Sequence, residues 1–247
     1  LETPLENPID AAWGADGRLY VLPQHEGRVI AVGEIVELCM GSGLVEDGAD
    51  GEHALETSMG FGAGLAVAGD GRIFVSDQGF ARVRRLNPDG TVETVLGTGA
   101  PGLGQPGLGP STAIRDPERL ALDEEANVLY VADMGNDRVL SVQLDTLEVS
   151  LVASGDLQSP VGLLLTGDGG LLVSELLGDR IRYVAPDGSL TTVAGDPGAQ
   201  EPRRSAEPLD MQIHGPAGLA WTPEGDLLVA ERLGQRVLRW VGARDAL

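Results

Sequence analysis

Residues 117–139, PERLALDEEANVLYVADMGNDRV, decide the fold, because their pattern recurs five times along the chain. Each copy opens with a four-residue frame, followed by an apolar run, a turn and a second apolar run. An arginine then opens a third run, 20 residues after the first frame residue in four copies and 21 in the third. Such self-similarity at a fixed period is the signature of a repeat architecture. The five frames are residues 8–11, 62–65, 117–120, 160–163 and 216–219.

Each copy predicts four short antiparallel strands. The runs are rich in Val, Ile and Leu and are bounded by Gly, Pro and Asp, as short strands are. Asp-Gly pairs mark tight turns between first and second strands, and Pro-Asp-Gly at 88–90 and 186–188 marks turns between third and fourth strands. Four antiparallel strands repeated radially are the pattern of a β-propeller.

We therefore predict an all-β, five-bladed β-propeller that forms one domain over residues 1–247. The last copy shows no fourth strand before Leu247. That blade is three-stranded, is closed by residues 1–5, or was cut before a sixth unit. The predicted blades span residues 6–43, 58–99, 114–154, 157–197 and 213–243.

Composition excludes several functions. The 17 basic residues are all arginine, against 38 acidic residues, for a net charge of −21. A chain without lysine has no lysine for Schiff-base chemistry, and one without a basic stripe is a poor partner for nucleic acid. No apolar stretch is long enough to span a membrane, and Cys39 is the only cysteine, so no internal disulfide forms. The chain starts at Leu1, which slightly favours a periplasmic or secreted protein whose leader was trimmed.

Two strings resemble NHL repeats: LYVAD at 129–133 followed by NDRV at 136–139, and LTTVAG at 190–195. The resemblance covers nearly the whole chain and implies a propeller fold. The relatives it implies include calcium-dependent lactonases of the gluconolactonase and paraoxonase type, a zinc-dependent amidating lyase and many non-catalytic binding domains. Because propellers host many unrelated activities, the fold alone does not choose among them.

An acidic residue ends four of the second strands, five residues before the repeat arginine. This fixed spacing predicts a structural ion pair in each of those blades. Blade one has Pro23 at the acidic position, so Arg28 needs another partner, either Glu26 or a substrate. The four acidic residues are Asp77, Asp133, Glu175 and Glu231.

Residues at the entrance of the first strands converge on the channel mouth of a propeller, and those that break the repeat are site candidates. Glu118 is the only charged residue at the second frame position, where the other blades have Ile or Val or Ala. Polar residues also stand just before the frames, and Asp10 replaces a frame glycine. The set gathered at this mouth is Glu6, Asn7, Asp116, Glu118, Gln158 and His214.

This set is rich in oxygen donors, which calcium prefers. Gluconolactonase-like propellers resemble it in having a Glu two residues before a Pro in the first blade, as Glu6 is. Val161 and Ala217 stand where that family has further ligands, so a family-type calcium shell is incomplete. We predict a divalent metal, calcium rather than zinc, held by Glu6, Asp116, Glu118 and Gln158, with Asp10 as a further donor.

Strand alternation predicts that the loops of His25, His53 and His214 lie on one face. We expect His214 or His25 to act as general base near neutral pH, and His53 to be a solvated loop residue. Three histidines could instead hold zinc. Insertions at 43–59, 97–115 and 195–214 are expected on the same face, with residues 101–108 as a pocket rim.

Two functions remain open from the sequence. The first is a monomeric, metal-assisted lactonase with a small-molecule substrate. The second is a non-catalytic NHL-type module that binds a protein or a glycan. A zinc-dependent lyase is a further alternative.

Overall fold

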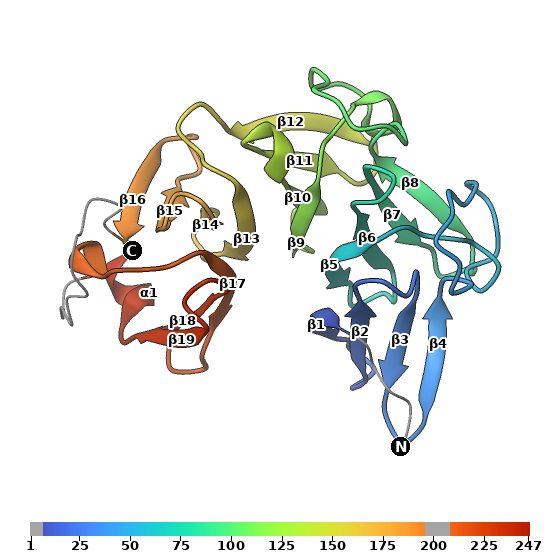
Figure 1. Cartoon of the computed structure of the whole chain (residues 1–247), viewed down its shortest axis with the longest axis horizontal. Helices are drawn as coiled ribbons and strands as arrows, with labels where there is room; N and C mark the ends of the chain where they lie inside the picture. The colour runs from blue at the N-terminus through green and yellow to red at the C-terminus, as the bar shows by residue number, and fades with distance from the viewer. Residues whose placement is uncertain (1–6, 196–207) are drawn as a thin grey trace. The chain divides into compact units, whose positions relative to one another are not determined.

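The computed structural model describes residues 7–195 and 208–247, and almost all regular structure in them is β-strand (Figure 1). Five antiparallel sheets follow one another along the chain, four of four strands and one of three. They are the blades of a five-bladed β-propeller, as predicted. No helix in the described residues is long and apolar enough to cross a membrane.

The strands lie within the predicted blade ranges, and every first strand begins at the first frame residue. Blades one to three comprise β1 (Pro8–Trp13), β2 (Leu19–Pro23), β3 (Val29–Val32), β4 (Val36–Met40), β5 (Gly62–Val67), β6 (Ile73–Asp77), β7 (Arg82–Leu86), β8 (Val92–Leu96), β9 (Pro117–Asp123), β10 (Val128–Asp133), β11 (Arg138–Gln143) and β12 (Glu148–Ala153). Blades four and five comprise β13 (Pro160–Leu165), β14 (Leu171–Glu175), β15 (Arg180–Val184), β16 (Leu190–Ala194), β17 (Pro216–Trp221), β18 (Leu227–Glu231) and β19 (Arg236–Trp240).

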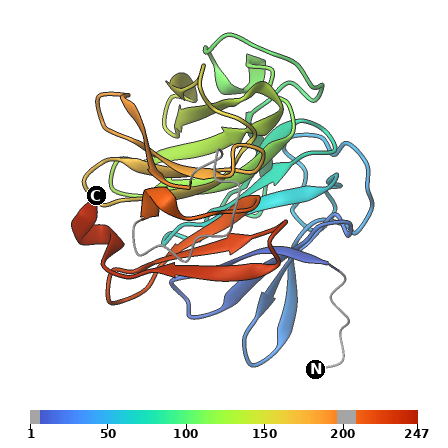
Figure 2. The ribbon, with the colours of Figure 1, turned by 60° about the vertical axis from the view of Figure 1, so that its left-hand side comes forward.

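The fifth sheet has three strands among the described residues, in the order β17-β18-β19 (Figures 1 and 2). The short helix α1 (Ala243–Ala246) follows β19. Residues 1–5, which the sequence offers as a closing strand, lie outside the described residues.

The chain divides into two compact units. Unit 1 comprises Leu1–Val131 and Ser141–Ser150, and unit 2 comprises Ala132–Leu140 and Leu151–Leu247. In unit 1, residues from blades one and two, among them Leu22, Val29 and Val75, share one apolar core. In unit 2, Leu172 and Ile181 of blade four pack with Leu227 and Val229 of blade five in the same way. Blades one and two of unit 1 therefore bury apolar faces against each other, as do blades four and five of unit 2.

Candidate functional site

The frame end of a blade is the end at which its first strand begins and its second strand turns into its third. Main-chain hydrogen bonds build this end in unit 1. Gln24 N donates to Asn7 O (3.0 Å), Gly62 N to Gln24 O (3.2 Å) and Gln78 N to Phe61 O (2.8 Å). The first two bonds tie the β2–β3 turn to its own first strand and to that of the next blade. The frame ends of blades one and two therefore lie at the same end of unit 1.

The residue just before the frame adopts a left-handed backbone in four of the five blades. Asn7, Asp116 and Ser159 have φ near 50°, and Gly215 has φ 55°. Asn, Asp and Gly tolerate this conformation better than other residues. The left-handed backbone therefore explains why Asn and Asp occupy positions 7 and 116 without requiring any role in binding. The Asp116 side chain is exposed.

Three of the four predicted ion pairs form. Asp133 accepts a hydrogen bond from Arg138 Nε at 2.6 Å, and Glu175 and Glu231 pair with Arg180 and Arg236. The acidic side chains are fully or almost fully buried.

These carboxylates also place two candidate site residues in unit 2. The main-chain N–H of Gln158 donates to Glu175 Oε1 (2.7 Å), and that of His214 donates to Glu231 Oε1 (2.8 Å). The positions of Gln158 and His214 are therefore fixed by the repeat, while their side chains are free to differ between blades.

The predicted pair in blade two is wrong. Arg82 pairs with Asp47 Oδ1 at 2.6 Å instead of with Asp77. Asp77 instead accepts main-chain N–H groups from Gly60 (2.8 Å) and Phe80 (3.2 Å), and its burial raises its pKa above the ordinary value. The physical reason is the insertion before blade two, which brings a second carboxylate to Arg82.

In blade one, Arg28 pairs with Glu26, one of the two partners predicted for it. Glu26 lies in the β2–β3 turn, three residues beyond the proline that replaces the usual acid. A residue of the chain itself therefore neutralises Arg28.

Glu118 is the most constrained of the candidate residues. It lies near the start of β9 with 8% of its surface exposed. Gln78 Nε2 donates to its carboxylate Oε1 at 3.0 Å, and Ser76 Oγ donates to its main-chain carbonyl at 2.7 Å. A buried carboxylate costs free energy unless polar partners compensate it, and here Gln78 provides such a partner. The other blades have small or branched apolar residues at this position.

His25 lies on the β2–β3 turn of blade one and is exposed to solvent. Its ring meets the ring of Phe61 edge-on, with centroids 5.3 Å apart and an interplanar angle of 81°. This contact orients the imidazole through its carbon framework, and the ring nitrogens make no hydrogen bond to another described residue. The ring is therefore accessible for proton transfer at the frame end of unit 1.

The placement predicted for His53 is wrong. His53 forms an isolated bridge with Thr91, and Ala54 N donates to Gly90 O at 2.8 Å. Gly90 and Thr91 belong to the β7–β8 turn, which lies at the opposite end of the strands from the β2–β3 turn of His25. His53 is exposed, as expected, but a zinc site made from all three histidines is not assembled.

Two insertions leave the predicted face over part of their length. Residues 51–54 run beside β8, where Val92 N donates to Glu52 O (3.0 Å). Residues 107–109 run beside β12, where Val149 N donates to Gly107 O (2.8 Å), whereas Gly104 N donates to Ala113 O (2.9 Å), in the segment that leads into β9. An uncovered outer strand exposes unpaired N–H and C=O groups, and both insertions cover such an edge in unit 1.

Two arginines of β7 fasten the first of these insertions. The buried Arg84 donates from Nη1 to Gly48 O (2.9 Å) and from Nη2 to Ala49 O (3.2 Å), beside the Arg82–Asp47 pair. A guanidinium can hold two neighbouring carbonyls at once because its N–H groups form a planar fork.

The candidate residues divide between the two units. His25, Asp116 and Glu118 belong to unit 1, and Gln158 and His214 to unit 2, all at frame ends of their blades. Glu6 lies outside the described residues. Within residues 7–195 and 208–247, no group of three or more His, Cys, Asp or Glu is arranged to hold a metal. The oxygen donors of Asp116 and Glu118 suit calcium in kind.

Sequence reasoning missed Gln78 and the partner of Asp10. Asp10 Oδ2 pairs with Arg119 Nη1 at 2.8 Å. The signal was present: the third frame residue is Gly in blades two, four and five but Asp10 in blade one and Arg119 in blade three. Opposite charges at one repeat position predict a contact between their blades.

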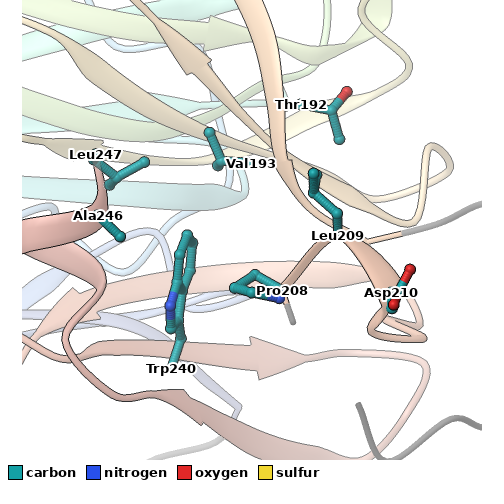
Figure 3. Close-up of a pocket in the computed structure, with 8 residues that line it drawn as sticks. All are labelled: Thr192, Val193, Pro208, Leu209, Asp210, Trp240, Ala246 and Leu247. Atoms are coloured by element: carbon teal, nitrogen blue, oxygen red, sulfur yellow. The ribbon is translucent and has the colours of Figure 1, made fainter. Parts of the chain in front are cut away.

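A cavity of about 490 Å³ lies in unit 2, away from the frame-end residues (Figure 3). Trp240 of β19 faces Val193 of β16 and Pro208 across it, while the Asp210 carboxylate lies to one side. Its walls are β16, residues 208–210, β19 and the C-terminal residues Ala246 and Leu247, and none of the predicted site residues lines it.

Comparisons with known proteins support the fold. No family model and no curated protein sequence matches the chain. Among solved structures, a virginiamycin B lyase from Staphylococcus aureus matches at 15% identity and TM-score 0.65, over 99% of this chain and 70% of the other. A chain of the nidogen–laminin complex matches at 15% and 0.67, over 94% and 74%. A candidate gluconolactonase matches at 18% and 0.62, over 93% and 72%.

These identities show a shared fold and no more. They confirm the NHL-like propeller that the repeat predicted. The three proteins differ in function, so the likeness leaves this chain's activity to be argued from its own residues.

Proposed function

We propose that the protein is a metal-assisted hydrolase of small cyclic esters, with its site at the frame ends of the blades. The observation that carries the proposal is Glu118: a buried carboxylate, held by an amide donor, at a strand entrance where the other blades have apolar residues. Unlike the buried acids that end the second strands, Glu118 has no acidic counterpart in the other blades, so repeat packing does not account for it.

Glu118 and Asp116, both of unit 1, would hold the metal. Bound calcium would supply a Lewis acid that polarises the ester carbonyl. The Gln78 amide fixes one oxygen of the Glu118 carboxylate, which limits the carboxylate to few orientations. His25, exposed and free of hydrogen bonds to described residues, would take a proton from the attacking water. His214, the alternative base, belongs to unit 2.

The charge of the chain suits this reaction. At a net charge of −21, the protein attracts cations and repels anions. A lactone is neutral and its hydrolysis product is a hydroxy acid, which is anionic near neutral pH. The acidic protein therefore favours release of the product.

The test is hydrolysis of a panel of γ-lactones by the full chain, with calcium and after chelation. We expect chelation and Glu118→Gln each to lower kcat/KM by about 100-fold, as loss of transition-state charge stabilisation does. Glu125→Gln, in the exposed β9–β10 turn, is the matched control and should retain activity. Unchanged hydrolysis in Glu118→Gln would refute the site.

A specific observation favours the binding module as a second candidate. Exposed apolar side chains stand at the frame ends: Phe61 (42% exposed) in unit 1, and Leu177 (68%) and Leu233 (63%) in unit 2. Exposed apolar residues can mark a protein-binding surface. No hydrolysis of any lactone and no bound metal in the purified protein would support this alternative.

A further inference from the structure

In blades two and four, the third frame residue decides how closely the first strand of the next blade approaches. A Cβ atom on Gly64 would lie 2.5 Å from Glu118 O, and one on Gly162 would lie 2.0 Å from Ala217 O. These distances are shorter than any real Cβ contact. Glycine at this position therefore lets the next blade's first strand come close.

A serine secures the same approach in both units. Ser76 Oγ donates to Glu118 O at 2.7 Å, and Ser174 Oγ donates to Ala217 O at 3.0 Å. This glycine–serine pair joins blade two to blade three in unit 1 and blade four to blade five in unit 2. Asp10 and Arg119 stand at the glycine position in the two blades that flank Gly64.

Arg119 reaches from blade three, past blade two, to blade one. Its guanidinium donates to Asp10 Oδ2 (2.8 Å), Ala63 O (3.0 Å) and Ile9 O (2.6 Å). Asp10 Oδ2 in turn accepts the N–H of Leu65 at 2.8 Å. The two side chains are 19% and 22% exposed, so the pair is largely shielded from water and from salt.

Glu118 is held on three sides as a result. Its carboxylate is fixed by Gln78, its carbonyl by Ser76, and its neighbour Arg119 by contacts with blades one and two. A metal-binding carboxylate functions when outer groups hold it in one orientation, and loss of such groups costs affinity.

We propose that Asp10 and Arg119 are positioning residues for Glu118. The pair fixes the start of β9 against β1 and β5 and so sets where the Glu118 carboxylate lies. The calcium-binding part of this inference rests on the proposed function. The contacts by which Arg119 joins blades one, two and three, here called the three-blade tie, can be tested without it.

The test combines calcium titration calorimetry with amide hydrogen exchange on the full chain. We expect Asp10→Asn and Arg119→Gln each to raise the calcium Kd about tenfold. The double variant should be no worse than either single one, because the pair acts as a unit. Arg119→Lys should not rescue, since an ammonium cannot hold three oxygens in the guanidinium geometry. The control is Asp70→Asn, which breaks the exposed Arg72 pair of the same unit and should leave the Kd unchanged.

A further variant separates positioning from a general loss of stability. Adding Asp10→Asn to Glu118→Gln should cause no additional loss of calcium affinity, because the carboxylate that the pair positions is already gone. An additional tenfold loss in that background would overturn the positioning role, and so would an unchanged Kd in the single variants.

The hydrogen-exchange measurement remains informative even if the wild-type protein binds no calcium. Absence of calcium binding would count against the proposed function alone. The Leu65 amide should then exchange at least tenfold faster in Arg119→Gln than in wild type, because Asp10 loses the cation that keeps it in place. An unchanged Leu65 exchange rate would overturn the three-blade tie itself.

Discussion

The acids at the ends of β6 and β14 occupy the same repeat position but have different partners, and this difference predicts unequal stability costs. Glu175 is fully buried, pairs with Arg180 and lies 3.9 Å from the almost fully buried Arg182. Asp77 is almost as deeply buried. Its hydrogen-bond donors described above are two main-chain N–H groups, those of Gly60 and Phe80, rather than an arginine. The informative perturbations are the neutral isosteres Glu175→Gln and Asp77→Asn.

Breaking a buried ion pair on one side costs about 3–5 kcal/mol. Arg180 keeps weaker contacts with Asp156 in Glu175→Gln, so we expect the lower end, about 3 kcal/mol. Asp77→Asn loses one main-chain hydrogen bond, worth about 1 kcal/mol. Part of that loss is offset because burial already disfavours the ionised Asp77, as its raised pKa indicates.

The expected difference of about 2 kcal/mol corresponds to about 4–8 °C in Tm for a chain of this size. Urea unfolding at pH 7, followed by far-ultraviolet circular dichroism and by tryptophan fluorescence, measures the two free energies of unfolding. Coincident transitions from the two probes are needed before the values are compared. The reasoning is refuted if Asp77→Asn costs as much as Glu175→Gln.

Three further results are expected. Gly162→Ala should lower Tm by 10 °C or more or leave the protein insoluble, because its Cβ would lie 2.0 Å from Ala217 O; a Tm near wild type in differential scanning calorimetry would contradict this. Asp168 has its pKa lowered to about 2 by the Thr166 hydroxyl and other donors, so its stabilisation is complete above its ordinary value of 3.8 and is lost as pH falls towards 2. Asp168→Asn should therefore reduce the fall in the free energy of unfolding between pH 4 and pH 2 by at most about 1 kcal/mol, because Asp168 is exposed. An unchanged pH dependence would count against the hydrogen bonds that lower its pKa. His53→Ala should leave lactone hydrolysis unchanged, since His53 lies at the opposite end of the strands from His25; a loss of activity would place the site elsewhere.

The fold could be predicted from the sequence because each repeat carries its own strand and turn signals. The proline or glycine that opens every frame begins a strand, and the arginines of blades two to five each begin the third strand. Spacing also predicted three ion pairs, since residues at a fixed offset across one turn meet in every blade.

Partners from outside the repeat could not be predicted in this way. Arg82 pairs with Asp47, and His53 lies beside the β7–β8 turn. Both contacts arise because part of the insertion at 43–59 runs along β8 rather than staying at the frame end. No periodicity describes an insertion, so its path depends on which edge it covers. Glu118 was identified correctly as an exception to the repeat, whereas its amide partner Gln78 follows from three-dimensional contact alone.

The edge-covering insertions of unit 1 have a consequence for how such a protein could change its specificity. Loops that protect strand edges cannot be exchanged freely, because a replacement that left β8 or β12 bare would invite aggregation. At the proposed site, selectivity would then depend on single side chains at the strand entrances, such as Asp116 and Glu118. Engineering a new ligand preference here calls for point substitutions at those entrances rather than for grafted loops.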